Sequence, residues 1–152
     1  MKFSKLTERI SQLGSDKWLV HLEARKLKKN NPNIIELTIG EPDQLPPNEL
    51  IQKCYESMIS GRIKYSNGRG EESLLEALAK KYQSRTSLKV SKNNFLCLPG
   101  TQTALFATVM CLVEEGDEIL VGDPYYATYE GIIKSSGANL IPIPLREEHD
   151  FS

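Results

Sequence analysis

Residues 116–145 read GDEILVGDPYYATYEGIIKSSGANLIPIPL, and this stretch decides the fold class. Glu118–Val121 is a short, mostly apolar run, which is typical of a buried strand. Pro124–Ser135 has the length of a helix, and Gly137 follows as its C-terminal stop. Leu140–Leu145 is a second expected strand. A strand, a helix and a strand at this spacing predict a βαβ unit in a largely parallel sheet.

The same order of elements begins further upstream. Phe95–Leu98 predicts another short buried strand, Pro99-Gly100 a turn, and Thr101–Glu114 a helix that is apolar nearly all round and therefore covered on both faces. Pro142 and Pro144 predict an edge or a bulge in the last strand, because proline cannot donate to a ladder. The sequence therefore predicts an α/β, three-layer fold with a mostly parallel sheet.

The first half of the chain reads as mainly helical. Ile34–Ile39 is a β-like run that precedes an extended loop.

Three strands are too few for such a sheet, and no terminating element follows residue 145. We infer that the chain is an N-terminal piece of a longer protein; the alternative is a small three-layer domain that a partner completes. Helices are expected at residues 4–13, 17–29, 50–59 and 71–82.

The composition excludes several function classes. The chain has 152 residues, 39% of them hydrophobic, and 19 basic against 20 acidic residues give a net charge of −1. This length can bury a core, and the balanced charge offers no basic face for nucleic acid or a membrane. The longest apolar run, Ala104–Val113, is too short to span a membrane, and the N-terminus lacks a signal-peptide core. A soluble, cytoplasmic protein is expected.

The cysteine and histidine pattern argues against a metal site. Cys54, Cys97 and Cys111 are widely spaced and odd in number, without a CxxC pair. No disulfide framework or zinc site is expected, and the cysteines read as small buried hydrophobes in a reducing compartment. Of the two histidines, His21 stands alone and is expected to be a partly exposed structural residue, and His149 lies near the C-terminus.

Two strand ends predict a ligand site, because ligands of open parallel sheets bind beyond the carboxyl ends of the strands. After Phe95–Leu98, the run Pro99–Thr103 opens a helix with free N–H groups and two threonine hydroxyls, which could cradle an anion. Gly100 allows close approach of the backbone. The alternative is a threonine-capped helix after a tight turn, and the run lacks the P-loop pattern GxxxxGK[ST].

The second strand end carries aromatic residues. Gly122–Tyr126 follows Glu118–Val121, and Tyr129 comes one turn later. A tyrosine here could stack on a flat ligand beside the anion cradle; the alternative is that these tyrosines are half-buried packing residues. No nucleophile, base or metal constellation stands out, and Lys92, which precedes the first strand, is expected to be a solvated surface lysine.

Together the motifs resemble the class I/II, fold-type I aminotransferases, which depend on pyridoxal 5′-phosphate (PLP). The resemblance runs from about residue 34 to the end, and it implies the N-terminal part of the PLP-dependent transferase fold. Thr101 and Gly122 depart from the usual family residues, but Thr101 keeps its backbone donor. Four blocks match in order, at Leu37–Asp43, Tyr65–Ala79, Gly100–Leu105 and Gly116–Tyr129.

The resemblance assigns roles to residues of the two strand ends. Gly100, Thr101 and Gln102 would hold the PLP phosphate together with the helix N-terminus. Tyr126 would stack on the pyridine ring. Gly40 would offer its backbone N–H to the substrate carboxylate.

The resemblance also implies an assembly and a division into domains. Members are usually homodimers with shared sites, and Tyr65 would reach the phosphate of the neighbouring subunit. Residues 1–47 would form an N-terminal arm and part of a small domain. Residues 48–152 would form the N-terminal part of the large, PLP-binding domain.

The function implied is transfer of an amino group between an amino acid and a 2-oxoacid. The lysine that holds PLP as a Schiff base lies beyond residue 152 in the family pattern, so no catalytic residue is assigned here. The longer protein is expected to be an aminotransferase, and residues 1–152 alone are expected to be inactive. The alternatives are a PLP-dependent β-lyase on the same fold, a non-catalytic aminotransferase-like binding module, and an orphan fragment that needs a partner to fold.

Overall fold

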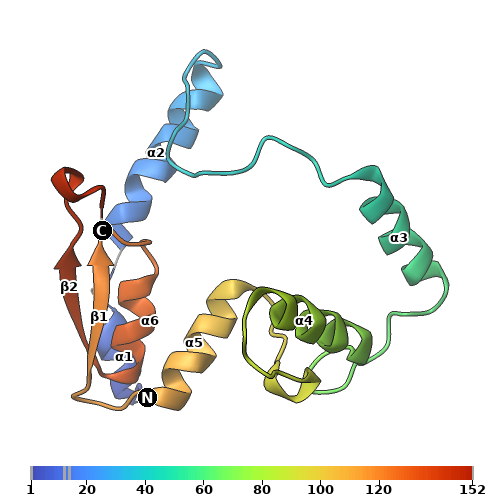
Figure 1. The fold of residues 1–152 in the computed structure, drawn as a ribbon. Helices are drawn as coiled ribbons and strands as arrows, with labels where there is room; N and C mark the ends of the chain where they lie inside the picture. The colour runs from blue at the N-terminus through green and yellow to red at the C-terminus, as the bar shows by residue number, and fades with distance from the viewer. Residues whose placement is uncertain (1, 12, 14, 152) are drawn as a thin grey trace. The chain divides into compact units, whose positions relative to one another are not determined.

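The computed structural model describes residues 2–11, 13 and 15–151, with the side chains of residues 15–17 left out. The chain divides into two compact units, Met1–Gly40 with Gly100–Ser152, and Glu41–Pro99. Figure 1 shows the elements of each unit. The first unit holds α1 (Lys5–Ile10), α2 (Ser15–Asn30), α5 (Thr101–Leu112), β1 (Glu118–Asp123), α6 (Tyr129–Ser136), β2 (Asn139–Pro144) and a 3₁₀ turn at Glu147–His149. The second unit holds α3 (Asn48–Ile59), α4 (Glu72–Arg85) and a 3₁₀ turn at Lys92–Asn94.

The predicted βαβ unit is confirmed. β1 pairs in parallel with β2, from Glu118 opposite Asn139 to Asp123 opposite Pro144, and α6 connects them (Figure 1). Within the described chain each strand pairs along one edge only. That position suits a strand with prolines, because their missing N–H groups need not interrupt a second ladder.

The helix between the strands is shorter than predicted. It begins at Tyr129 and not at Pro124, because residues 124–128 are irregular and end in a turn that is closed by a hydrogen bond from the Tyr129 N–H to the Tyr126 carbonyl, 3.0 Å. This turn follows the carboxyl end of β1. It therefore leaves the tyrosines of this loop outside regular structure, at the edge where a ligand is expected.

Two predicted strands are not strands in the structure. Phe95–Leu98 and Ile34–Ile39 belong to no sheet, and the second run bends at Thr38 and Ile39. A strand needs a neighbour to accept its ladder. Apart from the turn bond from the Phe95 N–H to the Lys92 carbonyl, the described residues offer the first run one backbone bond, from the Cys97 N–H to the Arg69 carbonyl, 2.8 Å. The prediction of strands was therefore wrong for both runs, because neither has a paired neighbour in the described chain.

The core of the first unit lies around α6. Ile132 and Ile133 of this helix are buried, together with Ala138 after it and Val109 of α5. In contrast to the prediction of cover on both faces, Val109 is the only buried residue of α5, and Met110 stays 46% exposed. The prediction of buried cysteines is also wrong for Cys54 and Cys111, which are exposed because α3 and α5 face outward at these positions. Cys97, outside any helix, is half-buried.

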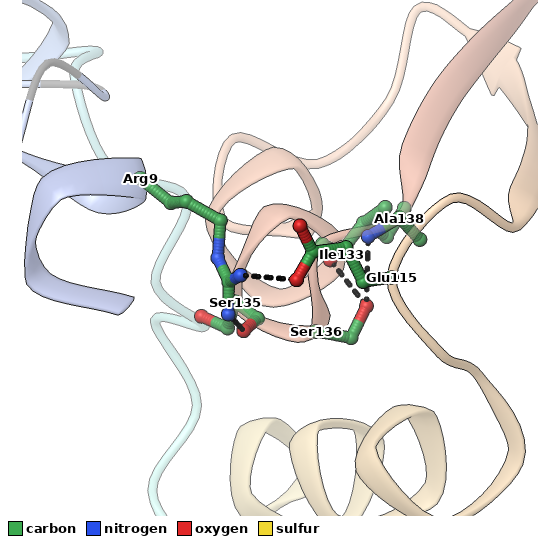
Figure 2. Close-up of polar contacts among 6 residues, drawn as sticks. All are labelled: Arg9, Glu115, Ile133, Ser135, Ser136 and Ala138. Atoms are coloured by element: carbon green, nitrogen blue, oxygen red, sulfur yellow. Dashed lines mark hydrogen bonds and ion pairs between the residues drawn. The ribbon is translucent and has the colours of Figure 1, made fainter. Parts of the chain in front are cut away.

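A side-chain clamp ties α1 to the end of α6 (Figure 2). Arg9 Nη2 donates to the carbonyl of Ser135, 3.1 Å, and Nη1 donates to Glu115 Oε2, 3.3 Å. Gly137 ends α6 in the left-handed conformation, with φ +92°. Because a Cβ at Gly137 would lie 3.0 Å from the Glu115 side chain and 3.2 Å from Arg9 Nη1, the clamp passes directly over this glycine.

A surface ion pair links the 3₁₀ turn of the second unit to α4. Lys92 pairs with Glu72 and lies 3.5 Å from Glu76 Oε1, both on α4. The hydrogen bond and the charge of Lys92 hold the pKa of Glu72 below its usual value, and Glu72 raises the pKa of Lys92. Lys92 is thus at the surface, as predicted, but paired. The predicted division into residues 1–47 and 48–152 concerns the complete fold and stays a prediction.

Alanine substitutions at Gly131, within α6, and at Gly137, just after it, are expected to have opposite effects on stability. Gly137→Ala is expected to lower the free energy of unfolding by about 1–2 kcal/mol, because alanine resists the left-handed conformation and its Cβ would displace Glu115. Gly131→Ala is expected to raise it by up to about 1 kcal/mol, because this position is helical and a Cβ there meets open space. Urea unfolding of the chain, followed by circular dichroism, measures both. Equal stability of the two variants would contradict the clamp at Gly137.

Candidate functional site

A pocket of about 760 Å³ opens in the first unit. Its walls come from α1, α2, the extended segment that ends at Gly40, the turn after β1, and α6. The lining residues that matter for chemistry are Trp18, His21, Thr38, Gly40, Tyr126, Thr128 and Glu130. Around them, apolar side chains such as Ile10, Ile39 and Ile132 complete a mostly apolar cavity with a few polar groups, which is typical of small-molecule sites.

The pocket brings together two predicted site residues from distant parts of the sequence. Gly40 and Tyr126 both line it. Tyr126 is 61% exposed, and its ring is tilted by 59° against that of Tyr129, with centroids 5.9 Å apart. The packing alternative therefore does not describe Tyr126, whose face is available to a ligand, but it fits the half-buried Tyr129.

The helix N-terminus at which an anion cradle was predicted is formed by α5, and anion binding there stays a prediction. The helix begins at Thr101, with Gly100 as its N-cap residue at φ +89° and no side-chain cap. The first-turn N–H groups of a helix have no intrahelical acceptor, so they stay available to an anion. The threonine-capped alternative is wrong, because the cap residue is a glycine. A Cβ at Gly100 would meet no atom within 4 Å, so open space lies beside it.

Thr128 connects this cradle to the pocket. Its hydroxyl donates to Gln102 Oε1, 2.8 Å away, and Thr128 itself lines the pocket. Thr128 is the N-cap residue of α6 but makes no side-chain cap bond there. Because the Gln102 carbonyl oxygen is engaged, the Gln102 amide N–H₂ is left to donate elsewhere. Sequence analysis missed Thr128, because the helix was predicted to begin at Pro124 and Thr128 then lay inside it.

His21 differs most from its prediction. It was expected to be isolated and partly exposed, but it is 7% exposed and hydrogen-bonded. Nδ1 lies 2.8 Å from Thr38 Oγ1 and 3.1 Å from Glu36 Oε1, and the ring meets that of Trp18 edge-on, with centroids 5.9 Å apart. The hydrogen-bonding partners of His21, Thr38 and Glu36, lie beyond the end of its own helix, so local sequence could not reveal them.

The remaining predicted site residue is Tyr65. Tyr65 belongs to the second unit and is fully exposed. Its expected contact with a phosphate of a neighbouring subunit stays a prediction. Where the structure describes the chain, no group of three His, Cys, Asp or Glu side chains could hold a metal ion, and no helix is long and apolar enough to cross a membrane.

Comparison with known proteins agrees with this geometry. The model of the family "Aminotransferase class I and II" matches residues 32–152. The arginine–pyruvate transaminase of Pseudomonas aeruginosa is 33% identical over 151 residues, which are 99% of this chain and 38% of that protein. The human kynurenine–oxoglutarate transaminase 3 is 31% identical, over 97% of this chain and 32% of that protein.

Solved structures give the same result. The aspartate aminotransferase of Thermus thermophilus with maleate superposes with a TM-score of 0.87 at 25% identity, over 99% of this chain and 39% of that one. The alanine aminotransferase of Pyrococcus furiosus superposes with a TM-score of 0.88 at 26% identity, over 99% and 38%. The chain thus spans less than two-fifths of the length of these relatives, and its α/β fold is part of the aminotransferase fold. By its sequence match and its fold, the chain belongs to the class I and II aminotransferase family.

Proposed function

We propose that the chain contributes the cofactor-anchoring part of a PLP-dependent aminotransferase, which moves an amino group between an amino acid and a 2-oxoacid. One observation carries this proposal. Gly40 and Tyr126 line one pocket, and Thr128 of the same pocket bonds to Gln102 in the first turn of α5. The groups proposed to hold substrate carboxylate, ring and phosphate therefore belong to one connected site.

The residues present fit the phosphate of PLP. A phosphate needs several donors and little negative charge nearby, and the start of α5 offers backbone N–H groups, the hydroxyls of Thr101 and Thr103, and the positive end of the helix dipole. No acidic residue lies in the first turn of this helix. The open space beside Gly100 lets the phosphate approach the backbone. We assign phosphate binding to Gly100, Thr101 and Gln102.

The pocket fits the rest of the cofactor and the substrate. The exposed ring of Tyr126 can stack on a flat pyridine, and the Gly40 backbone can donate to a carboxylate without a Cβ in the way. When bound, PLP would supply the electron sink for the α-carbon of an amino acid. The chain's own part is to bind and orient both partners, with apolar walls that limit water.

The proposal extends to features outside this chain. In the family pattern the Schiff-base lysine lies beyond residue 152, so this chain alone is expected not to transaminate. A homodimer in which Tyr65 reaches the neighbouring phosphate, and a cytoplasmic location, are parts of the proposal. The relatives named above are transaminases or aminotransferases, which supports amino transfer over the β-lyase reaction and over a non-catalytic module.

Phosphate-dependent binding tests the proposed function. Pyridoxamine 5′-phosphate is the probe, because its amine cannot form Schiff bases with surface lysines. Trp18 is the single tryptophan of the chain and lines the pocket, so its fluorescence reports binding. We expect pyridoxamine 5′-phosphate to bind at least about tenfold more tightly than pyridoxamine, since each charge-assisted bond to the phosphate contributes about 1.5–3 kcal/mol. Equal affinity for the two compounds would rule out the cradle.

The hydrogen bond from Thr128 to Gln102 predicts a second, smaller effect on the affinity for pyridoxamine 5′-phosphate. Thr128→Val keeps the shape of the side chain but removes the hydroxyl that orients Gln102. The affinity for pyridoxamine 5′-phosphate is expected to fall by about fivefold, the worth of about one hydrogen bond, while Thr128→Ser keeps it. Fluorescence titration of the three chains measures the difference. An unchanged affinity in the valine variant would show that Gln102 needs no orientation by Thr128.

A further inference from the structure

One face of α2 is turned toward the segment that leads to Gly40. Trp18, His21, Arg25 and Lys28 recur at helical spacing, so they lie along a single face of the helix. Arg25 Nε and Lys28 Nζ both lie 3.8 Å from carboxylate oxygens of Glu36. The side chain of Glu36 is 16% exposed, so the face of α2 covers it.

His21 forms the buried end of this contact. The Thr38 hydroxyl donates to Glu36 Oε1, 3.0 Å, and so uses its single proton. It must therefore accept at the 2.8 Å contact with His21 Nδ1, which places a proton on Nδ1. The three groups form a chain of hydrogen bonds from α2 into the extended segment. The Nδ1–H is within 3.1 Å of Glu36 Oε1 as well, so the carboxylate supports the same arrangement.

The extended segment has little else to hold it. Residues 35–40 are in no helix or strand. In the part of the chain that the structure describes, no backbone–backbone hydrogen bond involves residues 35–40. An extended backbone without a ladder keeps a single conformation only where side chains fix it. Glu36 and Thr38 are the residues of this segment that make such side-chain bonds to α2.

We infer that His21 is a positioning residue, which fixes the segment 36–40 through Thr38 and Glu36 and thereby sets the place of the Gly40 N–H in the pocket. The inference deepens the proposed function, because it assumes that Gly40 receives the substrate carboxylate. His21 and Thr38 line the same pocket as Gly40, so the hydrogen bonds act within the wall of the site itself.

The sequence allows Gly40 to be observed alone by NMR. Ile39-Gly40 is the only Ile–Gly pair of the chain, and Val121-Gly122 is the only Val–Gly pair. Carbonyl-¹³C isoleucine with ¹⁵N glycine thus leaves one cross-peak in a carbonyl–amide correlation spectrum, that of Gly40. When valine is carbonyl-¹³C-labelled instead of isoleucine, the single cross-peak is that of Gly122. Gly122 lies in β1, so its cross-peak serves as the control for the fold of the first unit.

Two variants of His21 separate positioning from mere folding. His21→Leu fills the space but removes the donor, and His21→Asn places an amide N–H as many bonds from Cβ as Nδ1. In His21→Leu we expect the native Gly40 conformer to fall about fivefold in population, seen as a shifted or divided Gly40 cross-peak, with the Gly122 cross-peak unchanged. His21→Asn is expected to restore the native Gly40 cross-peak.

Two results would overturn the inference. An unchanged Gly40 cross-peak in His21→Leu would show that the segment is held without His21. Loss of both cross-peaks in His21→Leu and His21→Asn would show that His21 serves the fold as a whole. The spectra contain no ligand, so a failure of pyridoxamine 5′-phosphate to bind bears on the proposed function and leaves this result standing.

Discussion

The parallel pairing of β1 with β2 is the constraint on which the first unit depends. Two parallel strands must be joined by a crossover, and here α6 makes it, so the strand pairing places the N-terminus of α6 near the carboxyl end of β1. That geometry puts Tyr126 and Thr128 into one turn at the ligand-binding edge. The buried Ile132 and Ile133 then hold α6 in place, because the apolar core of this unit is gathered on that helix.

Side chains, and not backbone ladders, attach the N-terminal segments to this unit. Arg9 fastens α1 at the end of α6, and His21 fastens the segment before Gly40 to α2. Both contacts bridge elements that have no sheet or helix bond in common. Such attachments would suit the proposed role of the Gly40 N–H, since the described backbone hydrogen bonds include none from residues 35–40.

The site follows the general logic of open α/β sheets, although one of its expected strands is absent. Phe95–Leu98 belongs to no sheet, yet the helix after it still begins at Thr101 with an uncapped N-terminus. The proposed anion binding rests on the helix end, and it does not need the strand to be paired. The hydrogen bond from Thr128 to Gln102 joins the turn after β1 to the first turn of α5.

The sequence by itself determined the family, the βαβ unit, the helix at Thr101 and the residues Gly40 and Tyr126 as site candidates. Periodicity, glycine stops and short motifs are local properties, so they can be read along the chain. Only the tertiary structure decided that Phe95–Leu98 stays unpaired, that His21 is buried, and that Thr128 bonds to Gln102. Each of these depends on a partner that is distant in sequence, and the local sequence around a residue does not specify that partner.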